Sequence, residues 1–127
     1  MIRALLCAGA VSLALIGSAS AHHSTAMFEW GKEVSLQGTV KEYQWTQPHT
    51  FLWVIVQGSN GTVQEWGLEG MSPSWLGRRG WGRNTFKAGD KVSVVYYPLK
   101  DHRPGGFYVR VKGSDGQVME ALPQRGG

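Results

Sequence analysis

The sequence of 127 residues has a single cysteine, Cys7, which lies in an apolar stretch near the amino terminus. A domain built from the rest of the chain therefore has no thiol, which excludes disulfide bonds and thiolate metal sites. An exported domain without cysteine is compatible with a bacterial periplasm, where domains fold without disulfide bridges.

The sequence also lacks a hydrophobic run of about 20 residues, the length a membrane-spanning helix needs. Its apolar run, Ala4 to Ile16, follows the basic Arg3 and precedes Ala19-Ser20-Ala21, the small-x-small pattern of a signal peptidase site. We therefore expect a cleaved signal peptide over residues 1–21, a periplasmic or secreted location, and no transmembrane segment after cleavage. A lipoprotein signal is disfavoured because Cys7 comes near the start of the apolar run, whereas a lipidated cysteine would follow the run.

Charge of one sign is also scarce. The 13 Lys and Arg and 9 Asp and Glu residues give a formal charge of +4, which falls to +3 once Arg3 is removed. So weak a basic bias gives no reason to expect a nucleic acid partner. The remaining 106 residues suffice for one domain, expected over residues 22–122, and we expect residues 123–127 to form a frayed tail.

Alternation of apolar and polar residues predicts several β-strands. The alternation from Val34 slips by one position at Glu42-Tyr43, which indicates a bulge. Residues 49–57 are apolar on both faces, as in a central strand, and Asn60-Gly61 predicts a hairpin after them. The predicted strands cover residues 34–45, 49–57, 62–69, 92–97 and 107–112, with an edge strand at 117–120.

A short helix is predicted between the third and fourth strands. Ser72 has the properties of an N-cap, Pro73 suits the first helical position, and Gly77 or Gly80 would end the helix. Three strands, a helix and two strands are the order of a small all-β, OB-like five-stranded Greek-key barrel. An antiparallel sandwich is the alternative; the strand that is apolar on both faces favours closure into a barrel.

The predicted cleavage creates a candidate metal site. It gives His22 a free α-amino group beside its imidazole, and the imidazole of His23 follows directly. Nitrogen ligands without thiolate indicate Cu(II), with Zn(II) or Ni(II) as alternatives. His49 would complete the site from the barrel, and His102 is a weaker candidate. Alternatively, the terminal histidines are solvated and His49 is a rim residue bonded to backbone. Cleavage two residues earlier would place histidine third, which still chelates Cu(II) through backbone nitrogens.

Six tryptophans follow the predicted signal peptide, more than a core of this size needs. Some of them, flanked by arginines, could bind a small ligand by stacking. This second hypothesis has no metal and no catalysis, and its ligand-binding residues are Trp45, Trp75, Arg78, Arg79 and Trp81. The competing interpretation puts Trp53 and Trp66 in the core, lets Trp75 and Trp81 attach the helix to the barrel, and leaves the arginines solvated.

Signals for an enzyme are few. Glu65 and Glu69 lie on the same side of the third strand, but we expect both to face solvent. There is no Ser-His-Asp spacing, phosphate-binding glycine loop or nucleophile elbow, so no catalytic residue is predicted. A structural protein of the cell envelope, with an envelope protein as its partner, is the third reading.

Several motifs together resemble the domain of unknown function 6152 family of small secreted bacterial proteins. They are His22-His23-Ser24, Trp45-Thr46-Gln47-Pro48-His49, Ser72-Pro73 with Leu76, Arg79-Gly80-Trp81, and Lys87-Ala88-Gly89-Asp90-Lys91-Val92. Gln47 stands where the family often has asparagine, and His102 falls outside the motifs. The resemblance implies an exported β-rich domain and brings no established activity.

Overall fold

The computed structural model describes residues 25–124; the predicted signal peptide, His22 and His23, and residues 125–127 of the predicted tail lie outside the described residues. The elements are η1 (Thr25–Met27), β1 (Val34–Gln44), β2 (Phe51–Gln57), β3 (Val63–Glu69), α1 (Pro73–Gly77), β4 (Lys91–Pro98), β5 (Gly105–Gly113) and β6 (Val118–Glu120). Neither helix in this part of the chain has the length or apolar character to cross a membrane.

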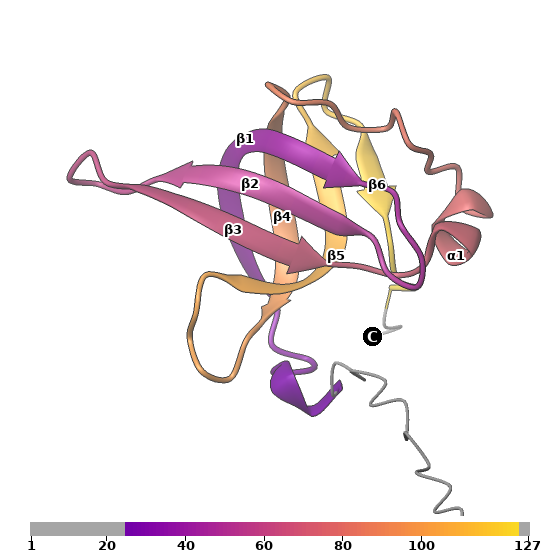
Figure 1. Ribbon diagram of the computed structural model, residues 1–127, viewed down its shortest axis with the longest axis horizontal. Coiled ribbons are helices and arrows are strands. Elements are labelled where there is room, and N and C mark those ends of the chain that lie inside the picture. Colours follow the sequence, from indigo (N-terminus) through magenta and orange to yellow (C-terminus); the bar gives the residue numbers. More distant parts are fainter. Residues whose placement is uncertain (1–24, 125–127) are drawn as a thin grey trace, which may run out of the picture.

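The strands form a closed five-stranded barrel (Figure 1). They follow the order β3-β2-β1-β4-β5, and β5 returns to β3 through the pairs Gly67↔Gly105 and Glu69↔Phe107. This last pairing is parallel, and the other ladders among residues 25–124 are antiparallel. The small OB-like barrel is therefore confirmed, and the sandwich alternative is wrong. The β2–β3 hairpin projects from one side of the barrel, and β6 adds an edge strand to β5.

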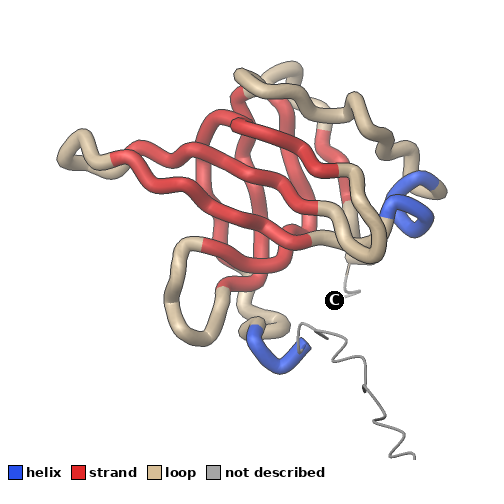
Figure 2. Tube along the Cα trace, viewed as in Figure 1, coloured by secondary structure: helices blue, strands red, loops and turns tan. Residues whose placement is uncertain are grey.

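Strand β1 lies at the middle of the strand order and pairs with two neighbours in succession. Its first half pairs with β4 up to Thr39↔Lys91, and its second half pairs with β2 from Thr39↔Ile55 onward. The register shifts between Val40 and Glu42, close to the predicted slip. A bulge increases local twist, which lets one strand curl through both ladders, as the strands in Figure 2 show.

Strand β2 has two different apolar faces. Leu52 and Val54 are fully buried inside the barrel, whereas Phe51, Trp53 and Ile55 point outward and are only partly covered. The inner residues join the main core, which consists of Leu36, Val40, Leu52, Val54, Leu68, Leu76, Trp81, Phe86, Val92, Val94, Tyr96, Tyr108, Val111 and Ala121. A second cluster of Phe28, Tyr97, Leu99, Phe107 and Val109 packs the segment after η1 against β4 and β5.

Helix α1 begins as the sequence predicts. Ser72 is the N-cap, its side chain accepts a hydrogen bond from the Trp75 amide at 3.2 Å, and Pro73 opens the helix. Its Leu76 is fully buried in the main core. The helix lies at the side of the barrel opposite the β2–β3 hairpin tip (Figure 1).

Candidate functional site

His49 and Glu69 form an imidazole–carboxylate pair at one end of the β2–β3 ladder. The Nδ1–H of His49 donates to Oε1 of Glu69, the last residue of β3, next to the pair Phe51↔Glu69. The Glu69 side chain is 6% exposed and that of His49 is 42% exposed. The expectation that Glu69 faces solvent is therefore wrong, because its carboxylate is buried at the end of β3, where it pairs with the imidazole of His49.

The pairing determines which ring nitrogen of His49 is available. Because Nδ1 donates to the carboxylate, the neutral ring keeps its lone pair on Nε2, and no described residue bonds that atom. Histidines that bind metals commonly donate their other N–H to a carboxylate, which orients the ring and makes the free nitrogen more basic. His49 therefore offers an oriented nitrogen donor at the barrel surface.

Buried hydroxyl groups support the loop that carries His49. Thr50 donates to the carbonyl oxygen of Met71 at 2.8 Å and shares a hydrogen bond of 2.5 Å with the hydroxyl of Tyr108. Burial raises the pKa of Tyr108 to about 12. Burial also raises the pKa of Tyr43, and the neighbouring Tyr108 adds to that rise. Both phenols thus stay neutral and fix the backbone next to His49.

A groove with a volume of about 320 Å³ lies on the outer face of β2 and β3. The rings of Phe51 and Trp53 line it as a stacked pair, with centroids 6.1 Å apart and planes 19° apart. Arg103 lines its rim from the loop between β4 and β5, and Glu69 lines it beside His49. The interpretation of Trp53 as core is wrong, because its side chain points outward from β2. The apolar outer face of residues 49–57 was the signal in the sequence that could have revealed this groove.

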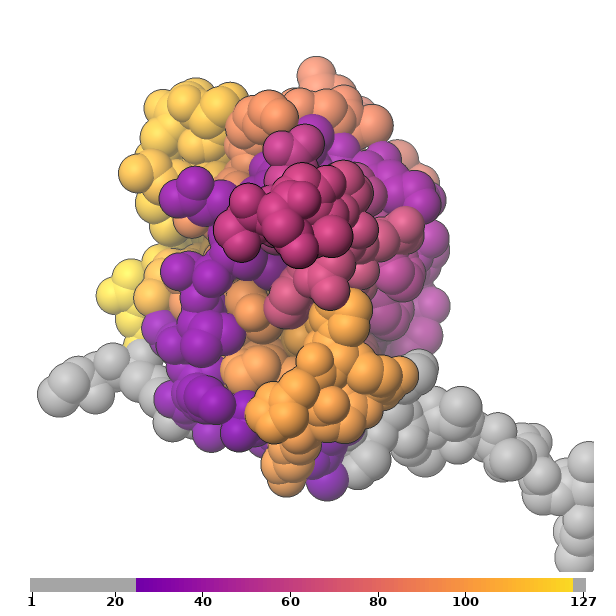
Figure 3. Space-filling model, turned by 90° about the vertical axis from the view of Figure 1, so that its left-hand side faces the viewer, coloured from indigo at the N-terminus to yellow at the C-terminus, as the bar shows by residue number. Residues whose placement is uncertain are grey.

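The start of the described chain borders the same groove. Met27 and Phe28 line it, Phe28 bridges to Leu99, and Lys100 donates its amide to the carbonyl oxygen of Met27. Figure 3 shows this indigo segment beside the orange loop around residue 100. The predicted ligands His22 and His23 precede Thr25 by only three and two residues and lie outside the described part.

The surface predicted around Trp75 and Trp81 offers little open ring area. Trp81 is 4% exposed and donates its indole N–H to the Glu120 carbonyl at 3.1 Å. Trp75 donates to the Ala121 carbonyl at 2.9 Å, and the Arg79 guanidinium covers its ring at 3.7 Å. Both indoles thus attach the β6 end of the chain beside α1.

Trp45 and Arg78 complete the predicted set. Trp45 is half-buried, packs edge-on to Tyr43 and stands against the main core. Arg78 is exposed. Trp66, expected in the core, is half-buried against the main core and meets Tyr96 edge-on at 5.5 Å. The five predicted ligand-binding residues line none of the hollows described here for residues 25–124.

The remaining sequence candidates lie apart from His49. His102 is exposed in the β4–β5 loop, with a φ of 62°, and borders a separate hollow with Trp66 and Tyr96. Within residues 25–124, no three His, Asp or Glu side chains gather closely enough to hold a metal ion.

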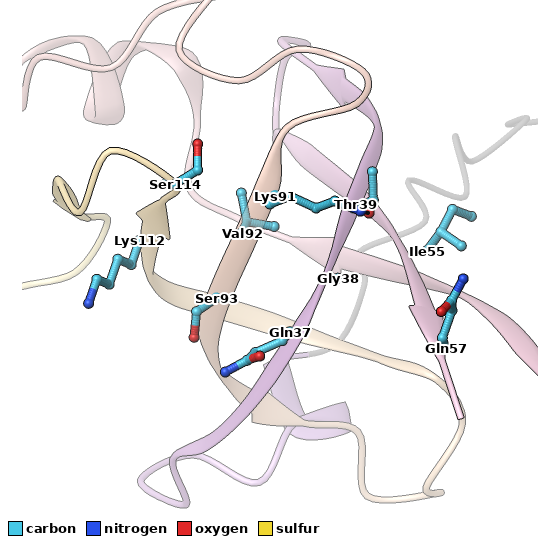
Figure 4. Close-up of a pocket in the computed structure, with 11 residues that line it drawn as sticks. Gln37, Gly38, Thr39, Ile55, Gln57, Lys91, Val92, Ser93, Lys112 and Ser114 are labelled. Atoms are coloured by element: carbon cyan, nitrogen blue, oxygen red, sulfur yellow. Dashed lines mark hydrogen bonds between the residues drawn. The ribbon is translucent and has the colours of Figure 1, made fainter. Parts of the chain in front are cut away.

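A larger hollow, of about 640 Å³, lies over β1 and β4. Lys91 reaches across it to donate to the Thr39 hydroxyl at 2.8 Å, and Lys112 points away from β1 (Figure 4). Its polar groups do not converge on one point, so the groove beside His49 is the stronger candidate site.

Comparison with known proteins agrees with the resemblance noted in the sequence. The model of a family of unknown function, DUF6152, matches residues 10–110, most of the chain. No curated protein and no solved structure matches.

Proposed function

We propose that this chain, which belongs to the DUF6152 family of unknown function, is a small exported metal-binding module. Cu(II) is the favoured metal, and Zn(II) is the alternative. In this proposal His49 supplies a ligand from the barrel, and His22 and His23 supply the others from the processed amino terminus.

The pairing of His49 with Glu69 carries this proposal. The buried carboxylate holds the Nδ1–H of His49 and leaves Nε2 free at the surface. A carboxylate that only keeps the surface soluble stays in contact with water, because burial of a charge costs free energy. Orientation of a histidine ligand is a role in which such a carboxylate is common.

The proposal places the terminal ligands at the same site. His23 precedes Thr25 by two residues, which span at most about 7 Å, so the proposal requires no long connection. Met27 and Glu69 line that groove together. An α-amino group and two imidazoles, with pKa values normally near 8 and 6.5, lose their protons easily at neutral pH and form a nitrogen-rich set that suits Cu(II).

Calorimetric titration with Cu(II) tests the terminal ligands. Protein that begins at His22 is compared with protein that carries four extra glycine and serine residues before it, so that neither His22 nor His23 stands at position three. We expect the extension to weaken binding at least tenfold, because it converts the terminal amine into an amide. Equal affinities would show that the amine is not a ligand.

The Glu69→Gln substitution tests the role of the carboxylate. Glutamine keeps the shape but loses the charge, and loss of such a partner typically weakens metal affinity about 10- to 100-fold. Glu65→Gln is the matched control, since Glu65 lies on the same face, is exposed and pairs with Lys41 at 2.8 Å. The same Cu(II) titration should show a loss for Glu69→Gln alone. Equal affinity of both variants and the parent would contradict the role of Glu69.

A further inference from the structure

We infer that the groove on the outer face of β2 and β3 also binds a neutral oligosaccharide of all-equatorial pyranose units. The site consists of Phe51, Trp53, Glu65, Glu69 and Arg103. The aromatic rings of this site cannot ligate a metal, so sugar binding would be a further activity beside metal binding. The groove has a volume of about 320 Å³, within the range of small-ligand pockets.

The aromatic floor provides a stacking platform. A side-chain carbon placed at Gly67 would lie 2.6 Å from the Trp53 ring, so the indole occupies the space that a side chain would take on the neighbouring strand. Phe51 continues the platform nearly parallel to it. An all-equatorial sugar ring exposes flat faces of axial C–H groups, which pack on such a surface. Both rings are only partly buried, so they have area left for a ligand.

The rim supplies the polar groups that sugar hydroxyls need. Glu65 and Glu69 offer carboxylate acceptors on one side of the platform, and Arg103 offers N–H donors across it. A hydroxyl group both donates and accepts, so it can use either kind of partner. Asp101 accepts from Nε of Arg103 at 2.6 Å and orients the guanidinium at this rim.

The charges of the groove favour a neutral ligand over a nucleic acid. Two carboxylates and one guanidinium line the groove, Lys41 pairs with Glu65 and Asp101 pairs with Arg103, so the groove has no run of unpaired cations for a phosphate chain. Single-strand nucleic acid sites combine aromatic stacking with a positively charged track. This groove has the stacking surface without the track, and we therefore assign it to a sugar.

The test uses the exported chain after EDTA treatment, titrated with cellohexaose, with hexa-N-acetylchitohexaose and with a single-stranded hexanucleotide. Binding is read from indole and backbone shifts in NMR spectra. We expect saturable shifts at Trp53 with at least one of the two sugars and none with the hexanucleotide. The absence of saturable shifts with both sugars, or tighter binding of the hexanucleotide, would overturn the inference.

Substitutions then locate the site. Trp53→Ala should weaken sugar binding at least tenfold. Arg103→Ala, at a position whose side chain is 67% exposed and so safe for folding, should weaken it several-fold. The matched control is Trp30→Ala, which removes an indole that is 43% exposed and does not line the groove. Equal loss in the control, or no loss in Arg103→Ala, would contradict the assignment. Because the sugar titrations use protein treated with EDTA, they are independent of whether the copper proposal holds.

Discussion

At the scale of single residues, hydrogen bonds connect the hydroxyl groups of Thr50, Tyr108 and Tyr43. They lie in the barrel behind the loop of His49, and Thr50 and Tyr108 are completely buried. The bond from Thr50 to the Met71 carbonyl ties the start of β2 to the segment that enters α1. A buried hydroxyl that loses its partner costs about 1–3 kcal/mol, so this chain of bonds contributes to the rigidity of the site.

The Tyr108→Phe substitution tests that contribution. It leaves the Thr50 oxygen without the phenol and should lower the free energy of unfolding by about 1–3 kcal/mol. Tyr97→Phe is the control, because Tyr97 is equally enclosed but its hydroxyl bonds no described residue. Urea denaturation measures both. A loss in Tyr97→Phe as large as in Tyr108→Phe would contradict the role of the hydroxyl chain.

The raised pKa of Tyr108 predicts a pH dependence. Below pH 10 the phenol is protonated in both states and stability is fully present. Between the ordinary pKa of 10 and the folded value of about 12, the unfolded chain loses its proton first, so stability falls as pH rises. Urea midpoints at pH 9 and 11 should therefore fall less in Tyr108→Phe than in the parent. Parallel curves would show that Tyr108 does not titrate in this way.

The sequence indicates part of this residue-level picture. His49 could be selected because it follows Pro48 at the start of an apolar strand. Its partner Glu69 could not, because the two residues are 20 positions apart and meet only through the register of β2 with β3. Composition and spacing do not specify that register, so the carboxylate was expected at the surface.

At the scale of elements, helix α1 follows from local rules. Ser72 and Pro73 carry the start signal, and no tertiary contact is needed to read it. The tryptophans nearby required the fold, because Trp75 and Trp81 bond carbonyl groups about 40 residues away, near β6. Propensity predicts where a helix begins, but it does not say which partner its aromatic residues will find.

The Ser72→Ala substitution tests the helix cap. Loss of the bond to the Trp75 amide should lower stability by about 1 kcal/mol. Ser74→Ala is the control. Ser74 lies two residues further along the chain, is exposed, and its hydroxyl accepts a hydrogen bond only from Gln47, at 3.3 Å. Thermal unfolding of the two variants should show a lower Tm for Ser72→Ala, and equal Tm values would contradict the capping role.

At the scale of the whole molecule, barrel closure depends on the close approach of β1 and β2. A side-chain carbon at Gly38 would lie 2.5 Å from both the Ile55 carbonyl oxygen and a methyl group of Val54. The order of strands and the helix between β3 and β4 could be predicted from alternation and turn signals. The parallel β3–β5 pairing could not, because parallel partners are far apart in sequence and leave no turn signature.

The Gly38→Ala substitution tests closure. Overpacking against backbone atoms should lower stability by about 1–3 kcal/mol. Gly82→Ala is the control, since a side-chain carbon there meets no atom within 4 Å. Urea denaturation should separate the two variants. Equal free energies of unfolding for the two variants would contradict a need for close contact between β1 and β2 at Gly38.

Pulsed electron paramagnetic resonance of the Cu(II)-loaded chain that begins at His22 tests the central claim most directly, because it detects imidazole nitrogens bound to copper. The account predicts that His49→Ala removes the signal of one imidazole while the barrel remains folded, and that His102→Ala leaves the spectrum unchanged. A spectrum that is identical in the parent and in His49→Ala would contradict a metal site completed by the barrel.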